Sequence, residues 1–135
     1  MTQHFSDRVT AAVAACGSCA VVGLDPVWER LPEAVRPKES VEQLGPEAAA
    51  EVIRGFCSEL LHLAAGQAAG VKPNIAFFEQ FYWWGVKAYY ELVAEAQKLG
   101  LLVIGDVKRG DIGSTAAAYA AGHVQTPAKA VAGIG

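Results

Sequence analysis

Three charged residues follow an uncharged, apolar run in the second half of the chain. The run covers residues 101–105, and Asp106, Lys108 and Asp111 then fall within six residues. Such a run is typical of a buried parallel strand. Because buried charges need opposite partners, a Lys between two carboxylates stays protonated and hydrogen-bonded. The spacing therefore indicates an ammonium group that can donate a proton, although a structural ion pair at a strand end would give the same pattern.

The side chains of the strand predicted over residues 101–107 alternate between its two faces. One face is apolar in the body of the strand and charged at its carboxyl end, and it consists of Leu102, Ile104, Asp106 and Lys108. The other face is uncharged and consists of Leu101, Val103, Gly105 and Val107. Charges at the carboxyl ends of strands are the pattern expected of α/β proteins whose chemistry lies where strands run out into loops.

Two further strands are predicted upstream, over residues 20–24 and 70–74. Asp25 follows the first of them, and Lys72 lies near the end of the second, next to Pro73, which cannot donate a ladder hydrogen bond. Every predicted strand therefore has a charge at its carboxyl end. A carboxylate before a proline is also common in plain turns, so Asp25 alone does not define a site.

Helical periodicity separates these strands. Helices are predicted over residues 5–15 with Ser6 as the N-cap, 47–65, 77–99 and 114–121, with a surface connection over 27–46. The alternation predicts a parallel sheet with right-handed crossovers, in either a (β/α) barrel or a doubly wound sheet. The inward charges of the third strand favour a barrel. The helix at 77–99 carries eight of the twelve aromatic residues, for which core packing and a subunit interface are the predicted uses.

Length and composition predict one globular domain, residues 1–135. The net charge is only −3, no basic stripe indicates nucleic-acid binding, and no apolar stretch predicts a membrane span or a signal sequence, so a cytoplasmic location is expected. Cys16 and Cys19 are spaced like a redox or zinc half-site, but no second pair completes it. Cys16, Cys19 and Cys57 are therefore expected to pack as reduced thiols, and no metal is predicted.

The segment Asp106-Val-Lys108-Arg-Gly-Asp111-Ile112-Gly-Ser-Thr115 resembles the signature of orotidine 5′-monophosphate decarboxylase. The stretches Gly-Leu-Asp25-Pro at the first strand and Lys72-Pro-Asn-Ile-Ala-Phe-Phe-Glu at the second resemble the same family's segments, in the same order. The resemblance covers roughly residues 5–121. The tail after residue 124 does not resemble the family's fourth strand.

The resemblance implies a dimeric (β/α)8 TIM barrel that converts orotidine 5′-monophosphate to uridine 5′-monophosphate, in pyrimidine biosynthesis, without metal or organic cofactor. By motif position, Asp25 would bind the ribose hydroxyls and Lys72 the ribose and the charged array. Asp106 would face the substrate carboxylate, and Lys108 would protonate the carbon that loses carbon dioxide. Asp111 would reach into the partner subunit's site, with Ile112 and Thr115 in the shared wall.

A full barrel takes eight strand–helix units and about 250 residues, whereas three units are predicted here. We therefore expect a truncated or partial chain that lacks the phosphate site, which such barrels usually build after strands seven and eight. Two alternatives remain open at this point. One is a partial barrel that catalyses nothing and acts as an interaction module, and the other is a magnesium-dependent sugar-phosphate decarboxylase or aldolase sharing the Asp-x-Lys-x-x-Asp pattern.

Overall fold

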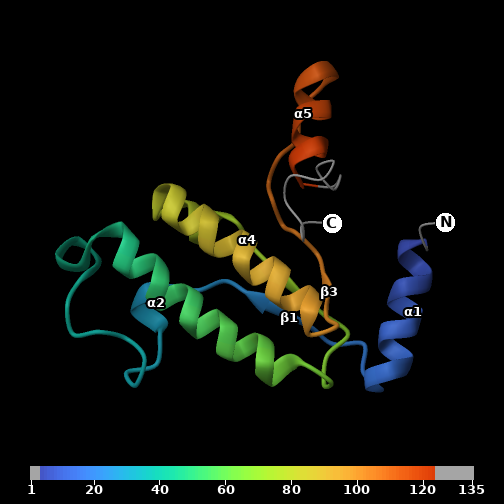
Figure 1. Ribbon diagram of the computed structural model, residues 1–135, viewed down its shortest axis with the longest axis horizontal. Coiled ribbons are helices and arrows are strands. Elements are labelled where there is room, and N and C mark those ends of the chain that lie inside the picture. Colours follow the sequence, from blue (N-terminus) through green and yellow to red (C-terminus); the bar gives the residue numbers. More distant parts are fainter. Residues whose placement is uncertain (1–3, 124–135) are drawn as a thin grey trace.

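The computed structural model describes residues 4–123, which form three successive strand–helix units after an N-terminal helix (Figure 1). The elements are α1 (Phe5–Cys16), β1 (Val21–Leu24), the 3-10 turn η1 (Trp28–Arg30), α2 (Val41–Ala64), β2 (Gly70–Pro73), α3 (Ala76–Glu79), α4 (Tyr82–Lys98), β3 (Leu102–Val103) and α5 (Gly113–His123). This order confirms the predicted partial (β/α) barrel. In the described part of the chain, no helix has the length and hydropathy of a membrane span.

The three strands form one parallel sheet in the order β1-β2-β3. Pairing between β2 and β3 continues beyond the two residues of β3, because Asn74 and Asp106 form a further parallel bridge. Ile104 N donates to Val71 O at 2.9 Å and Asp106 N donates to Pro73 O at 3.1 Å. In the alternating parallel ladder the donor between these two bonds would be the nitrogen of Pro73, which carries no hydrogen. The regular strand is therefore shorter than the predicted 101–107, although its pairing reaches Asp106.

One face of the sheet packs against α2 and α4, which lie side by side (Figure 1). The buried core there includes Leu24, Ile53, Cys57, Leu61, Val71, Phe78, Tyr89 and Leu92. On the other face, Ile104 is 41% exposed, whereas Leu101 is only 5% exposed. The predicted two faces of the third strand are thus confirmed, and the charged face is the open one.

The β2 and β3 strands approach each other closely at Gly70, which is paired with Leu102. A Cβ atom on Gly70 would lie 2.5 Å from the carbonyl oxygen of Leu102. Real side chains do not tolerate this separation, so β2 and β3 can pair in this register only with a glycine at position 70. That register in turn sets where Lys72 and Asp106 lie relative to each other.

The prediction of one helix over 77–99 is wrong, because the chain breaks between α3 and α4. Tyr82 has a φ of 55°, in the left-handed region that an L residue rarely adopts. Phe78 and Phe81 are buried on either side of the turn, and Gly85 packs against the chain so tightly that a Cβ atom there would lie 1.8 Å from Phe78 O. Tertiary packing of the aromatics therefore overrides the helical periodicity.

The N-terminal ends of two helices differ in part from the prediction. The α1 helix begins at Phe5 as predicted, but its N-cap is His4 and not Ser6, since the His4 ring nitrogen Nδ1 accepts from Ser6 N at 3.4 Å. The α2 helix begins at Val41, before the predicted 47, with a capping box between Ser40 and Gln43. Gly45 interrupts this helix with a φ of 78°, so the predicted segment corresponds to the part after the kink.

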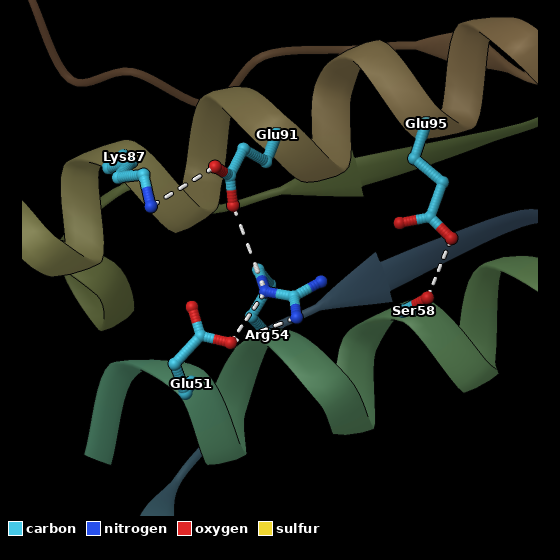
Figure 2. Close-up of polar contacts among 6 residues, drawn as sticks. All are labelled: Glu51, Arg54, Ser58, Lys87, Glu91 and Glu95. Carbon is cyan, nitrogen blue, oxygen red and sulfur yellow. Dashed lines mark hydrogen bonds and ion pairs between the residues drawn. The ribbon is translucent and has the colours of Figure 1, made fainter. Parts of the chain in front are cut away.

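The outer edges of α2 and α4 are joined by polar contacts (Figure 2). Arg54 donates to Glu51 Oε2 at 2.9 Å, and its Nε lies 3.7 Å from Glu91 Oε2. The hydrogen bond from Arg54 lowers the pKa of the Glu51 carboxyl. Further along, Ser58 Oγ donates to Glu95 Oε1 at 2.6 Å. The contacts of Arg54 with Glu91 and of Ser58 with Glu95 thus link α2 to α4 on the side of the helices that faces away from the sheet.

Candidate active site

The predicted strand-end residues lie along the carboxyl edge of the parallel sheet. Lys72 is on β2 and pairs with Gly23 of β1, and Asp106 pairs with Asn74 just after β2. Alternation along the strands places Lys72 and Asp106 on the open face, with Val71 and Leu101 on the buried one. The backbone register thus brings a cation and an anion from neighbouring strands together.

Asp106 is the centre of a cluster with two lysines. Its Oδ2 atom lies 3.6 Å from Lys72 Nζ, and its Oδ1 atom accepts a hydrogen bond from Lys108 Nζ. The hydrogen bond from Lys108, together with the charges of Lys108 and Lys72, lowers the pKa of the Asp106 carboxyl. Asp106 is therefore ionised at neutral pH, and both of its oxygens face ammonium groups.

Lys108 reaches Asp106 through a turn and not as part of an extended strand. Its φ of 52° lies in the left-handed region, which is uncommon for a residue other than glycine, asparagine or aspartate. Strict alternation predicts that the two residues share a face, and their contact agrees with that prediction. The left-handed backbone, which sequence reasoning did not foresee, turns the chain at this point. Strained conformations of this kind often occur at functional sites.

Among the residues that the structure describes, the other predicted site residues make no hydrogen bond or ion pair with this cluster. Asp111 Oδ1 accepts from Ile112 N at 2.8 Å, and Asp111, Ile112 and Thr115 are exposed at the start of α5. Asp25 is exposed just after β1. Lys72, Asp106 and Lys108 alone therefore carry a net charge of +1, which suits an anionic ligand.

A second ion pair at this edge was missed by the sequence analysis. The Arg109 guanidinium pairs with Glu79 at the end of α3, and its Nη1 also donates to Val107 O at 3.0 Å. Glu79 and Arg109 belong to two of the three segments on which the family resemblance rests. Their charges were visible in the sequence, but no spacing rule relates residues so far apart, so only the structure reveals the pair.

The cysteines do not contribute to the cluster. Cys57 is fully buried in the core, and burial raises the pKa of its thiol to about 12, so it remains a neutral thiol. Cys16 and Cys19 are also free, at the opposite end of β1 from Asp25. Over residues 4–123, no three histidine, cysteine or acidic side chains converge as a group that could hold a metal ion.

Comparison with known proteins adds to this geometry. Residues 21–134 match the model of the Orotidine 5′-phosphate decarboxylase / HUMPS family. The chain belongs to this family. The Lys72–Asp106–Lys108 cluster lies within the matched residues.

Individual relatives of the family agree. An orotidine 5′-phosphate decarboxylase of Rhodopirellula baltica is 42% identical over 116 residues, which are 86% of this chain and 38% of that protein. The enzyme of the same name from Deinococcus radiodurans is 38% identical over 122 residues, or 90% of this chain and 39% of that protein. The chain thus spans less than two-fifths of the length of these curated relatives.

Solved structures of the family give the same result for the fold. A crystal structure described as an orotidine-monophosphate decarboxylase of Toxoplasma gondii matches with a TM-score of 0.70 and 32% identity, over 87% of this chain and 36% of that one. One described as an orotidine 5′-phosphate decarboxylase of Streptomyces avermitilis matches with a TM-score of 0.66 and 33% identity, over 89% and 39%. The three strand–helix units correspond to part of a TIM barrel.

Proposed function

We propose that the chain carries the charged half of an active site that decarboxylates orotidine 5′-monophosphate to uridine 5′-monophosphate, in pyrimidine biosynthesis. The observation that carries the proposal is the placement of two ammonium groups on the Asp106 carboxylate at the open carboxyl edge of the sheet. Membership of the family supports the choice of substrate. Residues 1–135 would act as a single domain.

The proposed reaction uses Lys108 as the proton donor. The bond between the pyrimidine ring and its carboxylate breaks, carbon dioxide leaves, and the electron pair stays on the ring carbon. The Lys108 ammonium then gives its proton to that carbon, and water reprotonates the neutral amine. Preorganised cations are suited to this step because they stabilise the negative charge as it develops.

The remaining site residues have supporting roles in the proposal. Asp106 would lie against the substrate carboxylate and hold Lys108, and Lys72 and Asp25 would bind the ribose. Asp111, Ile112 and Thr115 are exposed, and Ile112 is 85% exposed. Their exposure supports a homodimer in which they complete the partner subunit's site, with Asp111 supplying the anion that the cluster in one chain lacks. The location proposed for this homodimer is the cytoplasm.

The metal-free reaction fits the cluster better than magnesium chemistry does. Magnesium is bound through carboxylate oxygens, and both oxygens of Asp106 face ammonium groups. A magnesium-dependent sugar-phosphate decarboxylase or aldolase would need one of these lysines to move away. Metal dependence therefore separates the two functions.

The test measures carbon dioxide release from orotidine 5′-monophosphate by the purified 135-residue chain, with and without a chelator. Turnover that survives the chelator, is lost in Lys108→Ala and is retained in Lys87→Ala would support the proposal. Lys87 is a matched control because it lies on α4 and pairs with Glu91, on the far side of the helices (Figure 2). Turnover abolished by the chelator would favour the magnesium reaction, and a folded chain without turnover would favour an interaction module.

A further inference from the structure

The Glu79–Arg109 ion pair ties the loop after β3 to a rigid part of the fold. Glu79 ends α3, the short helix between β2 and α4. That helix is fixed by the fully buried Phe78 and by Ile75, which is 2% exposed and whose amide donates to Asp106 O at 3.1 Å. Glu79 is therefore a well-anchored partner for Arg109.

Arg109, which follows Lys108, also binds the residue before it, Val107. Its guanidinium reaches Glu79 with one nitrogen and the carbonyl oxygen of Val107 with another. The residues before and after Lys108 are thus held by one planar group, whose donors have a fixed geometry. Lys108 lies between them in the left-handed conformation that points its ammonium at Asp106.

Beyond Arg109, the side-chain contacts of the segment after Lys108 are either with an adjacent residue or far along α5. Asp111 bonds only to the adjacent Ile112 amide among the hydrogen bonds described. Further along, His123 of α5 contacts Tyr90 of α4, with 3.1 Å between Tyr90 Oη and His123 Nδ1. Arg109 is thus the residue next to Lys108 that connects this turn to another element.

We propose that Glu79 and Arg109 are positioning residues for Lys108, which hold the turn at residues 107–109 so that its ammonium stays on Asp106. The inference rests on the proposed function for its catalytic meaning, since neither residue is required to touch the substrate. The alternative is that the pair is an ordinary surface salt bridge, which would add little.

The test uses Glu79→Gln in the full 135-residue chain and follows the Asp106 carboxyl by carbon-13 NMR against pH. If the pair positions Lys108, the variant loosens the turn, weakens the Lys108–Asp106 hydrogen bond and raises the Asp106 pKa. Loss of a negative charge near Asp106, with Arg109 left free, would by itself lower that pKa. The sign of the change therefore separates positioning from a through-space charge effect.

Two further variants complete the test. Arg109→Lys keeps the charge, but one ammonium does not reproduce the planar fork that joins Glu79 to Val107 O, so a smaller rise is expected. Glu91→Gln removes a paired carboxylate of α4 away from the sheet edge, and no change is expected (Figure 2). Circular dichroism checks that each variant is folded, and Arg109→Lys serves if Glu79→Gln does not fold.

Turnover gives the second readout. Glu79→Gln is expected to lower kcat on the order of 10- to 100-fold with KM nearly unchanged, the size expected when a reacting group is misplaced by about 1 Å. If the unaltered chain has no turnover, the proposed function fails, while the Asp106 titration still decides the positioning role. An Asp106 pKa that is unchanged or lowered in folded Glu79→Gln and Arg109→Lys overturns the inference.

Discussion

Lys72 Nζ lies 3.6 Å from Asp106 Oδ2, although the two residues come from different strands and Lys108 already occupies the other carboxylate oxygen. The parallel register between β2 and the end of β3 fixes this relationship. The Asp106 carboxylate therefore contacts one ammonium group from the neighbouring strand, that of Lys72, and one from the turn that follows it, that of Lys108. The two contacts differ in strength, because only Lys108 is within hydrogen-bonding distance.

The acid titration of Asp106 is expected to depend more on Lys108 than on Lys72. The Lys108 hydrogen bond is the largest cause of its lowered pKa, so Lys108→Ala should raise that pKa toward the usual value of about 3.9, and Lys72→Ala should raise it less. A group with a lowered folded pKa stabilises the protein above its unfolded pKa, and this stabilisation is lost as the pH falls through the folded value. Carbon-13 NMR measures both shifts, and equal effects of the two variants would contradict the assigned order.

The turn between α3 and α4 is expected to be sensitive to a single methyl group. Gly85→Ala would place a Cβ atom 1.8 Å from Phe78 O and should lower the free energy of unfolding by about 1–3 kcal/mol or more. Gly55→Ala is the control, since nothing lies within 4 Å of a Cβ on this residue of α2, and it should stabilise by about 0.5–1 kcal/mol. Urea unfolding followed by circular dichroism compares them, and equal midpoints would show that the turn relaxes.

The hydrogen bond between Ser58 and Glu95 should matter more than the ion pairs of Arg54. Ser58→Ala removes a half-buried donor to a carboxylate and should cost about 1–2 kcal/mol. Arg54→Met removes contacts with two exposed carboxylates and should cost less than about 1 kcal/mol. The free energies of unfolding in urea measure the difference, and a larger loss for Arg54→Met would reverse this ranking.

The exposed aromatics of α4 are expected to mediate association between chains. Trp83 is 59% exposed and its ring lies against that of Trp84, with ring centroids 3.9 Å apart and an interplanar angle of 34°. Trp83→Ser should weaken self-association by tenfold or more, as on the order of 2 kcal/mol is typical of a central interface tryptophan. Sedimentation velocity measures this, with Val35→Ser as the control, because Val35 is an exposed apolar residue of the segment between η1 and α2. Equal effects of both variants would argue against a specific interface at Trp83.

The sequence predicted parallel strands with charged carboxyl ends because these features follow from local periodicity, whereas the contact of Lys72 with the other charges was expected only from the family resemblance. Apolar runs ending in Asp106 and Lys72 imply parallel strands with charged carboxyl ends, and the register of the sheet then brings the charges together. Alternation also predicted that Lys108 would share a face with Asp106. It could not show the left-handed turn by which Lys108 does so, because that conformation depends on contacts outside the turn.

Features that depend on distant contacts were not predictable. The break before Tyr82 arises from packing of Phe78 and Phe81 in the core, while the local pattern is continuously helical. The Glu79–Arg109 pair joins two segments that are separated by the whole of α4. Propensity and periodicity describe neighbours along the chain, so neither could reveal these contacts.

The close approach at Gly70 has a consequence for how this sequence can change over time. Any side chain there would meet Leu102 O and push β3 away from β2, and Asp106 would move away from Lys72. A substitution at Gly70 would therefore separate Lys72 from Asp106 without altering either of those residues. Among descendants of this gene that keep the charged cluster, we expect glycine to be retained there, while the exposed Val21 on the same face varies freely.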